Sequence, residues 1–137
     1  MRRHLKCYKI MRLADLAKAH AARDHIELPY EGRLLRRKLL TTQSGQQVML
    51  DLAKVTDLHH GDRLILDDDQ QIEIRAACED LYEITSPDLV RIAWHVGNRH
   101  TPCQILPNSL RILRDHVMAD MLAHLGANLH EIDAAFN

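Results

Sequence analysis

The fold of this sequence is decided where strand-like periodicity gives way to helical periodicity, in the segment Ser86-Pro87-Asp88-Leu89-Val90-Arg91-Ile92-Ala93-Trp94-His95-Val96-Gly97. Ser86 is the predicted N-cap, Pro87 fits the first helical turn, and Asp88 favours the positive end of the helix dipole. An apolar stripe at helical spacing follows, formed by Leu89, Ile92, Ala93 and Val96. Gly97 is the predicted C′ residue, so the segment predicts one amphipathic helix that ends just before it.

Further elements on both sides of this helix complete a regular order. Strands are predicted at residues 81–85, 102–106, 110–113 and 128–132. Asp115 is the predicted N-cap of a second helix, which ends before Gly126. Its apolar residues recur at helical spacing, namely Val117, Met118, Met121, Leu122 and Leu125. The order strand, helix, strand, strand, helix, strand predicts a ferredoxin-like βαββαβ domain.

The first half of the chain carries strand signals of a different kind. Strands separated by turns that contain glycine or aspartate are predicted at residues 34–42, 47–52, 63–66 and 71–75. Lys9–His20 has a weak helical periodicity and is predicted as a helix. The sequence therefore predicts an α+β protein. A small antiparallel β domain covers residues 1–77, a ferredoxin-like domain covers residues 78–137, and the boundary lies between Ala76 and Asp80.

Composition and charge exclude several classes of protein. Residues 1–77 have 14 basic and 11 acidic side chains, whereas residues 78–137 have 4 and 8, so the net charges are +3 and −4. The acidic half is expected to attract cations more than nucleic acid. No apolar run is long enough to cross a membrane, and the basic start lacks the apolar segment of a secretory signal. Three widely separated cysteines fit a reduced, cytoplasmic protein.

His100 and His116 are two of the ten histidines, and each lies at an end of a helix predicted in the second half of the chain. His100 follows the glycine that is expected to end the first helix, and His116 lies at the start of the second. Neither has a second histidine four residues away, as in the His-Glu-x-x-His metal motif. A metal site that uses them must therefore be assembled between elements or between chains.

The segments around these histidines resemble the UreE family of urease accessory proteins, which are nickel metallochaperones. The resemblance rests on Gly97-Asn98-Arg99-His100 and on Asp115-His116-Val117-Met118-Ala119-Asp120-Met121-Leu122. In the first half, Leu28-Pro29-Tyr30-Glu31-Gly32-Arg33-Leu34 and Gly61-Asp62-Arg63-Leu64 are also similar to the family. The resemblance covers Asp24 to Phe136 and implies a partner-binding β domain before a ferredoxin-like metal-binding domain.

The resemblance also implies a function and a ligand set. His100 matches the histidine that each protomer contributes to nickel at the dimer interface, and His116 matches a further ligand. The implied protein is not an enzyme but a cytoplasmic homodimer that delivers Ni²⁺ for urease assembly, with Cu²⁺ and Zn²⁺ as competitors. Its implied partners are a nickel-loading GTPase and the apo-urease accessory complex. Certain relatives carry another histidine where this chain has Arg114, and many continue into a tail beyond the position of Asn137.

The residues leave two other functions open. One is a small thiol-dependent enzyme that uses Cys103 with His100, although nucleophilic catalysis needs a positioned base and an orienting third group. Cys103 is otherwise expected to pack in a strand, or to join the metal shell. The other is a metal-free protein-interaction module.

A basic cluster is the remaining signal, and it consists of Arg33, Arg36, Arg37 and Lys38. It is expected either to be a solvated strand face or to dock an acidic partner. Nucleic-acid binding is disfavoured because no aromatic side chains for base stacking accompany the cluster.

Overall fold

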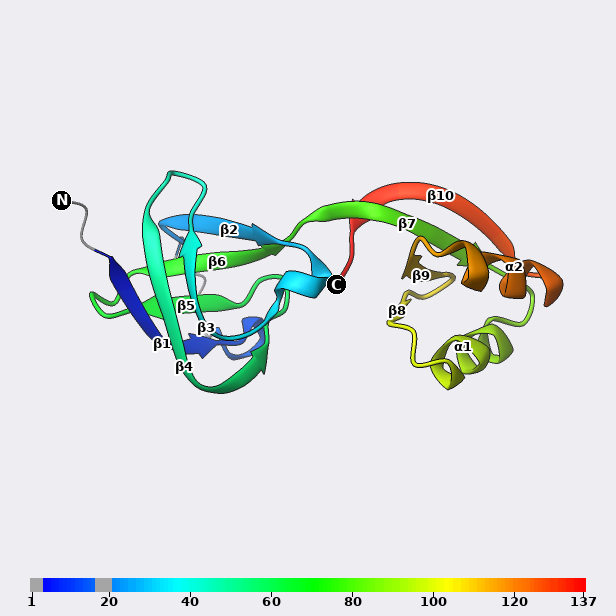
Figure 1. The fold of residues 1–137 in the computed structure, drawn as a ribbon, viewed down its shortest axis with the longest axis horizontal. Helices are drawn as coiled ribbons and strands as arrows, with labels where there is room; N and C mark the ends of the chain where they lie inside the picture. The colour runs from blue at the N-terminus through cyan, green and yellow to red at the C-terminus, as the bar shows by residue number, and fades with distance from the viewer. Residues whose placement is uncertain (1–3, 17–20) are drawn as a thin grey trace. The chain divides into compact units, whose positions relative to one another are not determined.

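The chain folds into two compact units. The structure is a computed structural model that describes residues 4–16 and 21–137. One unit comprises Met1–Ala77 together with Asn137, and the other comprises Cys78–Phe136. The first is built mainly from strands, whereas the second carries both α-helices (Figure 1). The predicted α+β class is confirmed.

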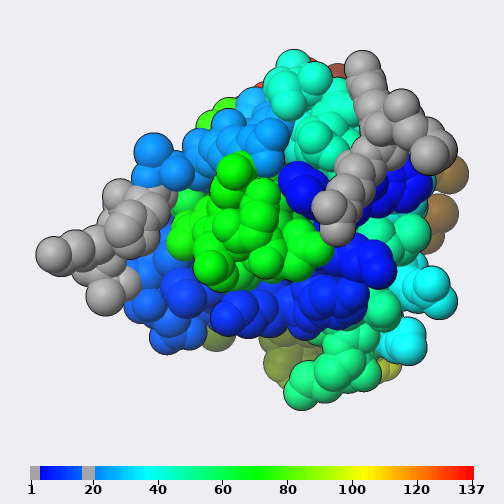
Figure 2. Space-filling view, turned by 90° about the vertical axis from the view of Figure 1, so that its left-hand side faces the viewer, coloured from blue at the N-terminus to red at the C-terminus, as the bar shows by residue number. Residues whose placement is uncertain are grey.

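The first unit contains a six-stranded sheet in the order β2-β6-β5-β1-β4-β3. Its elements are β1 (Leu5–Met11), a 3₁₀ turn (Leu13–Asp15), β2 (Asp24–Leu28), a 3₁₀ turn (Tyr30–Gly32), β3 (Leu34–Thr41), β4 (Gln47–Asp57), β5 (Arg63–Leu66) and β6 (Gln71–Ala76). Strands β3 to β6 confirm the four predicted strands. Alternate apolar side chains such as Val48, Leu50 and Leu52 form the buried core. Figure 2 shows one face of this unit, where β1 (blue) lies beside the segment of β5 and β6 (green).

The helix predicted over Lys9–His20 is wrong where the structure describes it. Lys9–Met11 belongs to β1, and only Leu13–Asp15 is helical, as a single 3₁₀ turn; residues 17–20 lie outside the described residues. β1 pairs in parallel with β4 and antiparallel with β5. Hydrogen bonding to strands on both sides, which are distant in sequence, overrides a weak local periodicity. β2, which was not predicted, also pairs in parallel, with β6, so the sheet is mixed.

The second unit has the predicted ferredoxin-like order. Its elements are β7 (Cys78–Thr85), α1 (Leu89–Asn98), β8 (Gln104–Ile105), β9 (Leu110–Leu113), α2 (His116–His124) and β10 (Asn128–Ala135). Its sheet has the order β10-β7-β9-β8, with every neighbouring pair antiparallel. Ile92 and Val96 of α1 and Met118 and Leu122 of α2 enter one core with sheet residues such as Ile112, so both helices pack on the same face. No helix in the described ranges is long and apolar enough to cross a membrane.

Two details of the helices differ from expectation. Asp88, and not Ser86, is the N-cap of α1, because its carboxylate reaches the N–H of Arg91 at 3.3 Å. The hydroxyl of Ser86 accepts a hydrogen bond from the N–H of Asp88. In α2, Val117 is 60% exposed. The buried stripe of α2 is centred on Met118 and Leu122. Because neighbouring residues are about 100° apart around a helix, Val117 lies to one side of this stripe, although the sequence predicts it as part of the stripe.

Candidate metal centre

The end of α1 places His100 in an uncommon backbone conformation. Its φ of 56° lies in the left-handed region. The N–H of His100 donates to the carbonyl of Gly97 at 3.0 Å, and the N–H of Thr101 donates to the carbonyl of Val96 at 3.4 Å. These two bonds form a Schellman motif with His100 at C′. The prediction that Gly97 occupies this position is wrong, because Gly97 lies inside the last turn of α1.

The end of α2 shows how the same motif is formed with its preferred residue. Gly126 has a φ of 82°, its N–H donates to the carbonyl of Ala123, and the N–H of Ala127 donates to the carbonyl of Leu122. Residues with a Cβ are disfavoured in the left-handed region by about 1–2 kcal/mol. Glycine at position 100 would therefore end α1 with less strain, so helix termination alone does not account for the imidazole.

His116 is positioned by the start of α2. Asp115 is the N-cap, as predicted, and its carboxylate accepts hydrogen bonds from the N–H groups of Val117 at 2.9 Å and Met118 at 3.5 Å. The first residue of the helix is therefore held in place while its side chain stays exposed. An exposed imidazole at a fixed backbone position is available for a ligand.

Within the part of the chain that the structure describes, neither histidine belongs to a complete metal site. In residues 4–16 and 21–137, no three His, Cys, Asp or Glu side chains come together in a way that holds a metal ion. The structure thus does not join His100 and His116 with a third protein ligand. Each presents an exposed imidazole.

Comparison with known proteins identifies the family. The models of the UreE urease accessory protein N-terminal and C-terminal domains match residues 9–77 and 72–137. The chain is 53% identical over 115 residues to the urease accessory protein UreE of Ruegeria pomeroyi, covering 84% of this chain and 77% of the relative. It is 43% identical over 136 residues to the urease accessory protein UreE 1 of Brucella suis biovar 1, covering 93% and 84%. This chain belongs to the UreE family of urease accessory proteins.

Membership of the UreE family excludes the thiol-dependent enzyme, because the family consists of accessory proteins and not enzymes. The surroundings of Cys103 agree. The side chain is half-buried against the core of the second unit, and its Sγ lies 3.9 Å from the carbonyl oxygen of Gln104. Burial raises the pKa of the Cys103 thiol, so it stays protonated at neutral pH. It is therefore a packing residue in this UreE chain.

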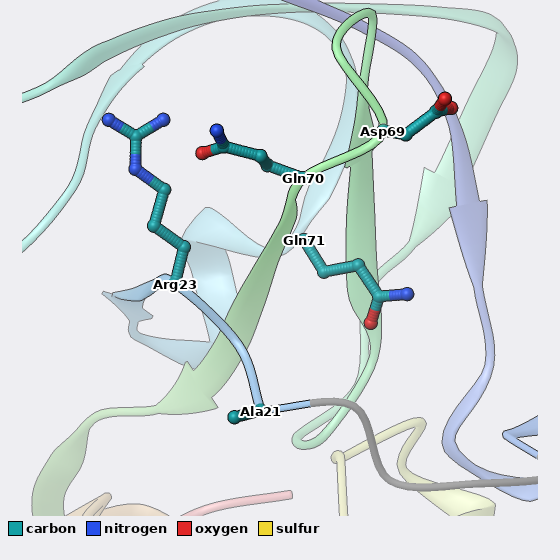
Figure 3. A pocket seen from close by; sticks show the side chains of 5 residues that line it. All are labelled: Ala21, Arg23, Asp69, Gln70 and Gln71. Carbon is teal, nitrogen blue, oxygen red and sulfur yellow. The ribbon is translucent and has the colours of Figure 1, made fainter.

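Two hollows in the described part of this UreE chain lie away from both histidines. A pocket of about 360 Å³ in the first unit is lined by Ala21, Arg23, Asp69, Gln70 and Gln71. Arg23 extends beside Gln70, while Asp69 points away from them (Figure 3). A second, apolar hollow of about 370 Å³ in the second unit is lined by Leu89, Val90, Ala93, Ile105, Leu106, Pro107 and Leu110. His100 and His116 line neither hollow.

The backbone at His100 gives a first prediction. His100→Gly and His100→Ala both remove the imidazole, but only glycine relieves the left-handed strain. We expect the glycine variant to be more stable than the alanine variant by about 1 kcal/mol, as measured by urea denaturation. Gly126→Ala, which places a Cβ in the same left-handed conformation, should lower the free energy of unfolding by a similar amount. Equal stability of the two His100 variants would contradict the assigned conformation.

The burial of Cys103 gives a second prediction. In variants that keep one cysteine each, we expect a disulfide reagent at pH 7.5 to label exposed Cys78 quickly, half-buried Cys103 more slowly, and fully buried Cys7 slowest. Burial raises the pKa of both Cys103 and Cys7, which lowers the thiolate fraction of each. Labelling of Cys103 as fast as that of Cys78 would show a reactive thiol.

Proposed function

We propose that this chain is a cytoplasmic nickel metallochaperone that binds Ni²⁺ as a homodimer and delivers it for assembly of the urease active site. The observation that carries the proposal is His100, an exposed imidazole in a position where the backbone favours glycine. Family membership supports the link to urease. The metal is cargo, so the site has to release it as well as bind it.

The chemistry of imidazole suits this task. Imidazole binds nickel, copper and zinc, whereas carboxylate-rich sites favour magnesium and calcium. One imidazole holds a metal weakly, but two copies of His100 across a two-fold axis hold it more firmly, with water or His116 completing the shell. Such an open site exchanges its metal more readily than a closed four-ligand site. Because affinities rise from nickel to copper, Cu²⁺ competes with Ni²⁺, and Zn²⁺ is a further competitor.

The second unit, which we assign to metal binding and dimerisation, has an apolar surface suited to a second copy. Val90 and Trp94 lie one turn apart on α1 and are 83% and 63% exposed, and Ile105 is 73% exposed. Exposed apolar patches of this kind mark interaction surfaces. The apolar stripe of α2 is not available as this surface. Met118 and Leu122 enter the core, and Met121 and Leu125 pack against it.

The first unit, which we assign to partner binding, presents a smaller basic surface than the sequence predicts. Arg36, Arg37 and Lys38 are exposed on β3, which lies at the edge of the sheet. Arg33 is only 2% exposed and donates to the carbonyl of Leu28, so it does not belong to this surface. The three exposed cations suit an acidic partner surface. The proposed partners are the nickel-loading GTPase and the apo-urease accessory complex.

The third prediction concerns the stoichiometry of nickel. A site shared by two copies of His100 binds half an equivalent of Ni²⁺ per chain. His100→Ala removes both contributions at once, so tight binding should be lost in equilibrium dialysis while the fold persists. His130→Ala, which removes another exposed histidine of the same unit, serves as the control, and Cys103→Ala should also bind normally. Unchanged nickel binding in His100→Ala would rule out this site, whereas failure of the unsubstituted chain to bind nickel would favour a metal-free interaction module.

The fourth prediction concerns pH. Protons compete with nickel for the imidazole nitrogen, and histidine changes charge between about pH 5 and 8. We expect nickel to be held at pH 7 and released as the pH falls through about 6 to 5, with more than one proton taken up per ion. The dimer should persist, because its proposed interface is apolar. Light scattering alongside the nickel titration checks both points, and retention of nickel at pH 4.5 would contradict histidine ligation.

A further inference from the structure

A second pair of metal-ligating side chains lies on α2, the later of the two α-helices of the second unit (Figure 1). Asp120 and His124 are both exposed and are separated by four positions. Residues at this spacing lie one above the other on the same face of a helix. In the His-Glu-x-x-His helices of zinc enzymes, two side chains at this spacing bind one metal ion. The backbone therefore brings a carboxylate and an imidazole to one place.

A hydrogen bond determines which ring nitrogen of His124 is free. Nδ1 lies 2.8 Å from the main-chain oxygen of Asp120. A carbonyl oxygen only accepts, so Nδ1 carries the proton and the neutral ring keeps its lone pair on Nε2. Metal-binding histidines are commonly held in this way, with the other nitrogen donating to a carbonyl or carboxylate. The same bond holds the ring of His124 over the turn that contains Asp120.

The charges around Asp120 also favour a bound cation. α2 contains no lysine or arginine, and no ion pair among the described residues includes Asp120. His124 lies in the last turn of the helix, where the helix dipole favours positive charge. Among the described residues, the carboxylate therefore has no cationic partner that a metal ion would have to displace.

We propose that Asp120 and His124 form a second divalent-cation site, which binds Ni²⁺, Cu²⁺ or Zn²⁺ through a carboxylate oxygen and Nε2, with water in the remaining positions. Imidazole is the ligand that selects these ions over magnesium and calcium. With two protein ligands from one chain, the site is weaker than the shared His100 site and exchanges its ion faster. His116 lies one turn before Asp120 on the same helix face, so the second site adjoins a proposed ligand of the first.

The test separates this site from the proposed function by using the full chain with His100→Ala. In that background, titration with NiCl₂ is followed by the broadening of histidine ring signals in NMR spectra. We expect the signals of His124 to broaden first. Asp120→Asn or His124→Gln should each weaken the remaining affinity by at least about tenfold. His130→Gln removes an exposed histidine on β10 and should leave the affinity unchanged.

The outcomes distinguish the second site from the proposed function. Unchanged affinity in both the Asp120→Asn and His124→Gln variants would overturn the second site. If His100→Ala alone abolishes all nickel binding, the second site is overturned while the proposed function stands. If His100→Ala keeps half an equivalent of tightly bound nickel and His124→Gln removes only a weaker event, the second site stands and the shared centre at His100 is wrong.

Discussion

The second unit depends on a sharp reversal of the chain at the end of α1. Ile92 and Val96 fix α1 against the sheet, and the backbone has only a few residues in which to turn back towards β8. The left-handed conformation of His100 makes this possible, because it directs the N–H groups of His100 and Thr101 back to carbonyls that the helix leaves free. The position of the imidazole thus follows from the packing of the helix.

This geometry explains how one residue both ends the helix and presents an exposed imidazole. A helix end is a rigid support when its last turn is packed, and Val96, the first acceptor of the motif, is fully buried. The side chain at C′ extends beyond the packed part of the helix and stays exposed. Strain of this kind is often concentrated at functional positions. The comparison with Gly126 is informative because both helices end with the same hydrogen bonds and differ in the residue at C′.

The sequence predicts the elements that local periodicity determines. The stripe of α1, the cap at Asp115 and the strands from β3 onward follow from spacing alone. β1 and β2 do not, because their stability comes from pairing with strands that are distant in sequence, in part in parallel. The predicted N-cap of α1 is wrong by two residues. Serine and aspartate are both favourable N-cap residues, and only the folded geometry shows whether the hydroxyl of Ser86 or the carboxylate of Asp88 reaches a helix N–H. Glycine is the usual residue at C′, so the sequence predicts that α1 ends just before Gly97, yet the helix continues through it.

Metal ligands are harder to predict, because a site shared between chains leaves no cluster in any one of them. The sequence singles out His100 by its place after a predicted helix end, and the resemblance to a family adds the expected ligand role. The structure adds the reason why that backbone position is unusual. The Asp120–His124 pair, by contrast, lies on one helix of a single chain. Its spacing is visible in the sequence, but spacing alone does not say which ring nitrogen is free. That information comes from the hydrogen bond to the Asp120 carbonyl. In both proposed sites the ligands of one chain do not close around an ion, which leaves positions open for the acceptor of a proposed carrier.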